Sequence, residues 1–206
     1  EHYMIKDLPA ADWINQWDSY TETSHAKEIF TDPYAADVDL KHMVDGWFVP
    51  TMADLNQKQP QLLSYLTQNA IWWVEYADLS GYRVDTYPYN SRDEITQWTK
   101  AIMDEYPSFS IVAESWVINP IHLSYWQKDS PIAAMSSFNS QVTHVKDFNL
   151  FAAVQDIYQG DTQWWDQKMN KIYKVFQNDF VYANPNDLMV FLENHDTTRI
   201  LSLIHI

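Results

Sequence analysis

Residues 61–85 read QLLSYLTQNAIWWVEYADLSGYRVD, and this stretch decides the fold. Its apolar residues recur at helical spacing: Leu62, Leu66, Ala70, Trp73 and Ala77. The segment from Gln61 to Tyr76 is therefore predicted to be an amphipathic helix, with Trp73 in the core. Asp78 to Gly81 ends that helix, and Tyr82 to Asp85 follows as a short strand. One helix followed by one buried strand is the unit of an α/β fold.

The alternation of helix and strand continues along the chain. Ser91 and Glu94 form a capping box that predicts a helix running to about Tyr106, before Pro107. Further segments are predicted as strands at Phe109–Ala113, Val145–Asn149 and Leu188–Leu192, and as a helix at Thr162–Phe180. This order favours a parallel sheet covered by helices. With only 3 glycines there is no phosphate-binding loop, which excludes the dinucleotide-binding version and favours a partial (β/α)8 TIM barrel.

Two parts of the chain differ in character. Residues 1–60 contain scattered prolines without a sustained period, so they are predicted to be long loops with short helical pieces. Residues 61–206 are predicted to hold the strand-helix units of the barrel. Both ends read like sequence within a domain, and the apolar tail 201–206 has no stop signal, so we expect truncation at both ends.

Composition restricts the partners. The net charge of −15 repels phosphate backbones and anionic lipids, so neither nucleic acid nor a membrane surface is an expected partner. The absence of cysteine excludes disulfides, thiolate metal sites and a cysteine nucleophile. No apolar run reaches membrane-spanning length. Neutral sugars are not repelled, and the 10 tryptophans and 13 tyrosines offer aromatic faces for them.

Three carboxylates follow predicted strands: Asp85, Glu114 and Asp196. In a parallel barrel the active site lies at this end of the strands. Arg83 is two residues before Asp85, so both side chains should point the same way, and the guanidinium should keep Asp85 ionised. Retaining glycosidases need a nucleophilic carboxylate and a protonated acid about 5–5.5 Å apart, which are roles that suit Asp85 and Glu114. Any single carboxylate of this kind is more often a salt bridge or a cap, but three at strand ends favour a site.

Other candidate residues are less specific. Asp37 and Asp39 begin like a calcium loop, but Lys41 stands where an oxygen ligand belongs, so a solvated turn is preferred. The seven histidines lack paired zinc-ligand spacing, so no metal ligand is assigned. Four aromatic residues near strand ends could stack on glucose rings or pack in the core: Tyr87, Tyr89, Trp116 and Trp126.

Three motifs resemble conserved regions of the α-amylase family of glycoside hydrolases, in matching order: Gly81-Tyr82-Arg83-Val84-Asp85, Ala113-Glu114-Ser115-Trp116 and Phe191-Leu192-Glu193-Asn194-His195-Asp196. A fourth segment, Met52-Ala53-Asp54-Leu55-Asn56, resembles the motif of the neopullulanase and cyclomaltodextrinase branch, as do residues 2–9 and 46–51. The resemblance runs from residue 2 to about Arg199.

The resemblance implies roles for these residues. Asp85 would be the nucleophile, Glu114 the acid/base, and Asp196 the carboxylate that stabilises the transition state. Arg83 and His195 would position the nucleophile and the sugar, with Tyr87 and Trp116 as further substrate-binding candidates. The family's earliest conserved region, which supplies a substrate-binding histidine and in many members a calcium ligand, does not occur in this chain. No cofactor is therefore assigned, and calcium is left open for the full-length protein.

A second departure concerns the substrate. Pro88-Tyr89 stands where calcium-dependent α-amylases carry Lys-His, which disfavours an ordinary endo-acting α-amylase. The expected substrates are cyclodextrins, pullulan or malto-oligosaccharides, and the expected partners are α-glucan oligosaccharides and a second copy in a homodimer of the full-length protein. A periplasmic or otherwise extracytoplasmic location is favoured. Transglycosylation or glucoside isomerisation on the same intermediate, or a non-catalytic glucan-binding barrel, are the alternatives.

Overall fold

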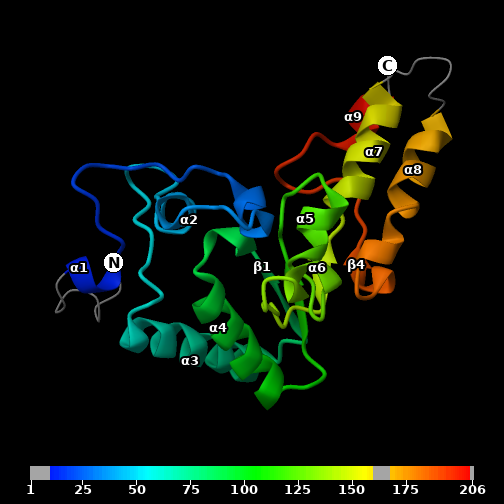
Figure 1. Ribbon diagram of the computed structural model, residues 1–206. Helices are drawn as coiled ribbons and strands as arrows, with labels where there is room; N and C mark the ends of the chain where they lie inside the picture. The colour runs from blue at the N-terminus through cyan, green and yellow to red at the C-terminus, as the bar shows by residue number, and fades with distance from the viewer. Residues whose placement is uncertain (1–9, 160–167, 205–206) are drawn as a thin grey trace. The chain divides into compact units, whose positions relative to one another are not determined.

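The computed structural model describes residues 10–159 and 168–204, and it divides the chain into two compact units, 1–111 and 112–206 (Figure 1). Each unit is considered by itself. The division at residue 60 proposed from sequence concerns the character of the chain and stays a prediction.

The first unit contains a loop-rich part followed by a helix-strand part. Its elements are α1 (Ala10–Trp13), η1 (Lys27–Thr31), α2 (Asp37–Val44), α3 (Pro60–Ala77), β1 (Gly81–Val84), η2 (Tyr87–Tyr89), α4 (Arg92–Glu105) and the start of β2 (Ser110–Ala113). The expected loops with short helical pieces are confirmed for the described part of the first 60 residues. β2 begins beside β1, where the Ser110 amide donates to the Ser80 carbonyl over 3.1 Å.

Helix α3 buries a stripe that shares Leu62 and Ala70 with the predicted one, whereas Leu66 is half-buried and Ala77 is exposed. Leu62, Ala70 and Val74 are buried, spaced by multiples of four residues on the face toward α4 and β1. Trp73 lies beside this stripe and is 45% exposed, so its predicted place in the core is wrong. The helix ends at Asp78, whose left-handed backbone (φ 52°) terminates it as expected. α3 and α4 lie side by side (Figure 1).

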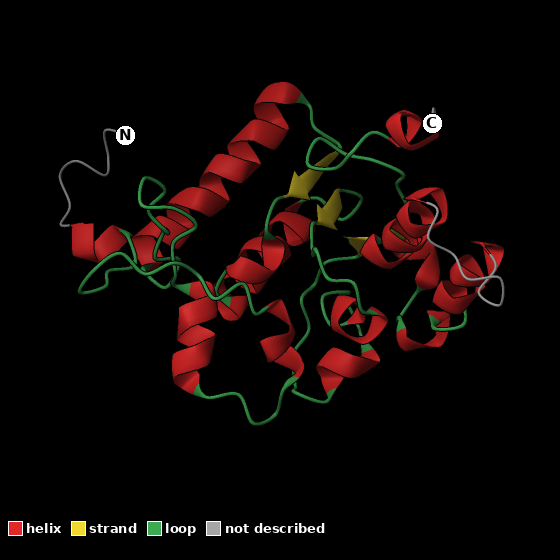
Figure 2. Cartoon of the chain, turned by 90° about the horizontal axis from the view of Figure 1, so that it is seen from above, coloured by secondary structure: helices red, strands yellow, loops and turns green. Residues whose placement is uncertain are grey.

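The second unit continues the pattern. Throughout the described residues, helices make up most of the regular structure and the strands are short (Figure 2). The elements of the second unit are the end of β2, α5 (Pro120–Ser124), α6 (Pro131–Ala134), β3 (His144–Lys146), α7 (Phe148–Gln159), α8 (Lys168–Phe176), η3 (Asp179–Val181), η4 (Pro185–Asp187), β4 (Leu188–Met189) and α9 (Ile200–Ile204). The strands run parallel in the order β2-β3-β4. Helical connections between parallel strands are what the sequence predicted.

Several predicted boundaries are wrong for local reasons. The third strand ends at Lys146 rather than Asn149, because the Asp147 carboxylate accepts a hydrogen bond from the Leu150 amide over 2.9 Å and starts α7. β4 ends at Met189 rather than Leu192. Helix α8 ends at Phe176 rather than Phe180, where the Asn178 amide side chain donates to the Lys174 carbonyl. The predicted residues 162–167 of that helix lie outside the described ranges.

The start of α4 was predicted correctly but for a mechanism that the structure does not contain. The helix begins at Arg92, directly after Ser91, and the Ile95 amide donates to the Ser91 carbonyl. The Ser91 side chain makes no capping hydrogen bond, so the capping box is not formed. The backbone geometry and the acidic first turn, Asp93 and Glu94, accompany the helix start instead.

Candidate active site

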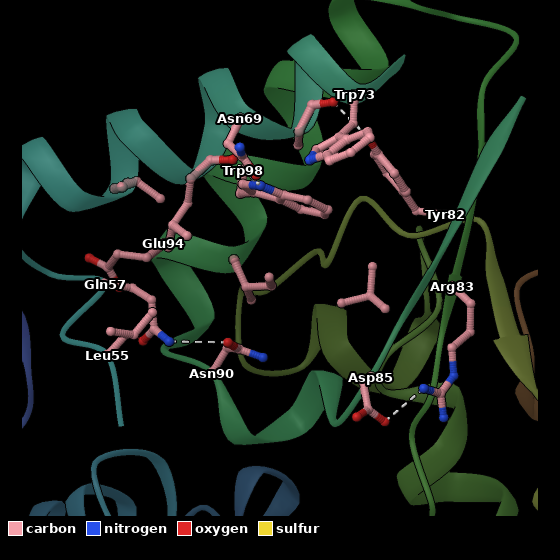
Figure 3. A pocket seen from close by; sticks show the side chains of 15 residues that line it. Leu55, Gln57, Asn69, Trp73, Tyr82, Arg83, Asp85, Asn90, Glu94 and Trp98 are labelled. Atoms are coloured by element: carbon pink, nitrogen blue, oxygen red, sulfur yellow. Dashed lines mark hydrogen bonds and ion pairs between the residues drawn. The ribbon is translucent and has the colours of Figure 1, made fainter. Parts of the chain in front are cut away.

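Asp85 follows β1 directly and forms the expected ion pair with Arg83. Their closest atoms, Arg83 Nη1 and Asp85 Oδ1, are 2.9 Å apart, and the side chains point toward each other (Figure 3). The Asp85 side chain is 65% exposed and the Arg83 side chain 33%. An ion pair this open contributes at most about 1 kcal/mol to stability, so its main consequence is to orient the carboxylate.

The residue after Asp85 turns the chain sharply. Thr86 adopts a left-handed backbone (φ 46°, ψ 39°), which is rare for a β-branched residue and costs on the order of 1–3 kcal/mol. The Thr86 carbonyl accepts from the Tyr89 amide over 2.9 Å, and the Asn90 side chain donates to the Tyr87 carbonyl over 3.1 Å. These bonds hold the turn, so the Asp85 carboxylate projects from a fixed point at the strand end.

A pocket of about 450 Å³ lies between α3, α4 and β1. The rings of Trp73, Tyr82 and Trp98 lie along one side of it, and Arg83 and Asp85 lie at its edge below Tyr82 (Figure 3). The opposite side carries the polar side chains of Gln57, Asn90 and Glu94, so the pocket combines aromatic faces with polar groups.

The four aromatic candidates fall into two classes. Tyr87 is fully buried with its hydroxyl 3.0 Å from Thr99 Oγ1, and burial raises the pKa of its phenol. Trp126 is also buried. Rings without an exposed face cannot stack on a sugar, so the expectation of substrate binding is wrong for Tyr87, which is a core residue.

The other two aromatic candidates are partly exposed. Tyr89 is half-buried, and its hydroxyl is hydrogen-bonded to His25. Trp116 is 36% exposed and stacks on Phe148 at 4.9 Å between ring centroids.

Glu114 follows β2 and is buried, unlike Asp85. Its side chain is 6% exposed, and its Oε1 lies 3.8 Å from Nζ of Lys146, which is equally buried. The flanking residues Ala113 and Ser115 are fully buried. Lys146 was not identified from the sequence; the only local signal was a lysine placed inside a predicted strand, where lysine is uncommon unless paired.

Asp196 lies in the loop after β4 and contacts its neighbour His195. The His195 Nε2 atom is 3.1 Å from Asp196 Oδ2, and the Asp196 amide donates to the Asn194 side chain over 3.0 Å. The side chains of His195 and Asp196 are 70% and 43% exposed. The two residues are thus held together by a short local turn.

The structure groups the candidates by unit. Asp85 and Arg83 belong to the first unit, and Glu114, Trp116, His195 and Asp196 to the second. The separation of about 5–5.5 Å between the Asp85 and Glu114 carboxyl groups stays a prediction.

The residues that the structure describes contain neither a candidate metal site nor a candidate membrane span. No three histidine, aspartate or glutamate side chains among them form a group able to hold a metal ion. Asp37 and Asp39 lie in the first turn of α2 rather than in a loop. Within the same ranges, none of the helices has both the length and the apolar character that crossing a membrane requires.

The protein-family model for the alpha-amylase catalytic domain matches residues 6–205 of this chain. The chain belongs to the alpha-amylase family. This membership confirms the resemblance of the three motifs, and with the parallel strands and outer helices it confirms the α/β, partial-barrel fold class. The family membership supports a glycoside hydrolase-like domain.

Solved structures of alpha-amylase family proteins share the fold. The α-amylase of Geobacillus thermoleovorans, solved with acarbose, matches 99% of this chain with a TM-score of 0.72 and 22% identity. An Anoxybacillus α-amylase matches the same share with a TM-score of 0.72 and 21% identity. A cyclomaltodextrinase matches 76% of this chain with a TM-score of 0.58 and 19% identity. The matches cover 39%, 39% and 24% of those chains, so this chain spans less than half of their length.

Proposed function

We propose that the full-length protein hydrolyses α-1,4-glucosidic bonds with retention of anomeric configuration. Asp85 acts as nucleophile, Glu114 as acid/base and Asp196 as the carboxylate that stabilises the positive charge on the sugar. The observation that carries this assignment is the contrast between two carboxyl groups at strand ends, Asp85 open and paired with Arg83, and Glu114 buried. Retaining glycosidases require two carboxyl groups in such different surroundings.

The reaction has two steps. In the first, an Asp85 carboxylate oxygen bonds to the anomeric carbon while the bond to the leaving oxygen breaks, and Glu114 gives its proton to that oxygen. In the second, the Glu114 carboxylate takes a proton from water, and the water oxygen displaces Asp85. Arg83 orients Asp85 throughout, and the sugar charge that develops in both transition states is opposite to that of Asp196.

The proposed substrates are cyclodextrins, pullulan or malto-oligosaccharides, as in the neopullulanase-like branch. The segment 52–56 that suggests this branch is fixed in the first unit by an antiparallel bridge between Leu55 and Ile14. The side chain of Asn15 also donates to that of Asp54 over 2.7 Å. This anchoring supports a structural role for the motif, while substrate choice rests on the resemblance and on Pro88-Tyr89.

Trapping the covalent intermediate tests the proposal. Full-length Glu114→Gln is mixed with an aryl α-maltoside, whose activated leaving group needs little protonation. We expect mass spectrometry to find an added maltosyl group on the peptide that contains Asp85. Asp85→Ala is the matched control and should give no adduct. An adduct on another carboxylate would refute the nucleophile assignment, and β-anomeric product from the unsubstituted enzyme would refute retention.

A further inference from the structure

Lys146 is placed beside Glu114 by the pairing of two strands. Val112 pairs with His144 and Ala113 with Val145, so the next residues in this parallel register are Glu114 and Lys146. Side chains at paired positions of neighbouring parallel strands project from the same face, about 4.8 Å apart. The distance of 3.8 Å between Lys146 Nζ and Glu114 Oε1 fits this geometry. The pair is therefore a consequence of strand register.

Two phenylalanine rings hold the ammonium group of Lys146 in its buried position. Nζ lies 4.5 Å from the ring centroid of Phe191 and 5.4 Å from that of Phe148. A buried ammonium is costly unless an opposite charge or aromatic faces compensate for lost water. Phe148 is itself fully buried and carries Trp116 on its ring. The lysine is thus fixed in place, with its charge directed at Glu114.

In the described part of the second unit, the charged residues near Lys146 in the chain and those that follow the paired strand β4 have partners of their own. On β3, His144 lies 3.8 Å from Asp187, and the Asp147 carboxylate caps α7. After β4, Glu193 pairs with Arg199 and His195 with Asp196. The residue paired with Lys146 on β4 is the neutral Met189.

We propose that Lys146 is a positioning residue for Glu114. Its positive charge, fixed 3.8 Å from the carboxyl group, sets the pH above which Glu114 no longer supplies a proton. This role rests on the proposed function. An adjacent cation favours the carboxylate over the acid, so Lys146 lowers the upper pH limit of activity. It also favours the second step, in which the Glu114 carboxylate acts as base.

The sign of the effect follows from charge. Removing the cation lets Glu114 keep its proton to higher pH, so the alkaline limb of kcat/KM should move upward by about one pH unit. Loss of the charge that favours the carboxylate in the second step should also lower kcat on malto-oligosaccharides, on the order of tenfold. A merely structural lysine would lower activity without moving the limb.

The test compares Lys146→Met with Lys146→Arg in the full-length enzyme, with Lys100→Met as control. Lys100 forms an exposed pair with Asp104 on α4, so its substitution removes the same charge at a residue to which no role is assigned. We expect the limb to move up in Lys146→Met and to stay in place in Lys146→Arg and Lys100→Met. Circular dichroism checks that each variant is folded.

Two outcomes overturn the proposal. The first is a folded Lys146→Met whose pH profile overlays that of the unsubstituted enzyme. The second, which remains decisive if the methionine variant does not fold, is a folded Lys146→Arg whose limb moves upward by about one unit, since that variant keeps the charge. If the unsubstituted enzyme cleaves no α-glucan, the proposed function fails. The pH dependence of carbodiimide labelling of the Glu114 peptide then still reports whether Lys146 controls that carboxyl group.

Discussion

The carboxyl group after β1 is two-thirds exposed and bound to an arginine, whereas the carboxyl group after β2 is buried and faces a lysine. Arg83 reaches Asp85 from the same strand, two residues away. Lys146 reaches Glu114 from another strand, 32 residues away in the chain. One pair is formed by local geometry and the other by tertiary structure.

This difference determines how each pair responds to change. An exposed ion pair is screened by water and salt and contributes little to stability, so the main effect of Arg83 is to orient the Asp85 carboxylate. A buried pair is held in a medium of low dielectric constant, so removal of one partner leaves an uncompensated charge. We therefore expect Asp85 to be sensitive to orientation and Glu114 to be sensitive to the charge beside it.

The largest expected effect is the loss of kcat in Asp85 and Glu114 variants, and the two losses should depend differently on the leaving group of the substrate. Asp85→Ala should lower kcat by roughly four orders of magnitude or more on both malto-oligosaccharides and aryl α-maltosides, because both need the nucleophile. Glu114→Gln should lose as much on malto-oligosaccharides but far less in the first step on the aryl substrate, because a good leaving group needs little protonation.

Pre-steady-state release of the aryl group measures that first step directly. A burst in Glu114→Gln and none in Asp85→Ala is the expected result. Equal losses of the two variants on both substrates would contradict the different roles. Binding of maltoheptaose, followed by calorimetry, should persist in both variants, since other groups hold the sugar.

A smaller effect should follow from the open pair. Arg83→Leu should lower kcat on the order of 10²-fold by releasing the Asp85 carboxylate from its orientation, with little change in thermal stability. Arg83→Lys should recover only part of this loss, because an ammonium group lacks the planar fork of the guanidinium. Unchanged turnover in a folded Arg83→Leu would show that the pair has no catalytic consequence.

The parts of the fold that sequence predicted well are those with strong local signals. Helix α3 and the strands β1 and β2 follow from helical periodicity and from short apolar runs between turn residues. The errors lie at boundaries decided by single hydrogen bonds. Asp147 starts α7 within a predicted strand, and an aspartate before an apolar helical pattern is a capping signal that the sequence does contain.

The candidate site residues divide in the same way, into those indicated by local sequence and those that depend on tertiary contacts. The three carboxylates and Arg83 were predicted because they lie within contiguous motifs. Lys146 was not, because its contact with Glu114 depends on strand register and its aromatic neighbour Phe191 is 45 residues further along the chain. The burial of Tyr87 also depends on a distant partner, Thr99 of α4, which no local pattern indicates.

Asp54 offers a third carboxyl group that separates burial from pairing with a cation. Burial raises the pKa of Asp54 to about 6, opposed by the hydrogen bond from Asn15 and by the charges of Lys58 and Lys41, and reinforced by Asp45. Both of these lysines form ion pairs with Asp45 instead. Asp54 is thus a partly buried carboxylate whose hydrogen-bonding partner is neutral.

The smallest effect expected is therefore a pH-dependent change in stability. The folded pKa of about 6 lies above the unfolded value of about 3.9, so the folded state binds more protons between them. Stability should fall as pH rises through this window, by about 1–3 kcal/mol. Asp54→Asn keeps an oxygen for Asn15 but does not titrate, so it should gain that amount relative to the unsubstituted protein above pH 7 and little at pH 4. Urea midpoints of full-length protein at both pH values measure this, with exposed Asp104→Asn as control. If Asp54→Asn is no more stable than the unsubstituted protein above pH 7, burial does not disfavour the Asp54 carboxylate. Burial would then also not explain why Glu114 is expected to be more sensitive than Asp85 to the charge beside it.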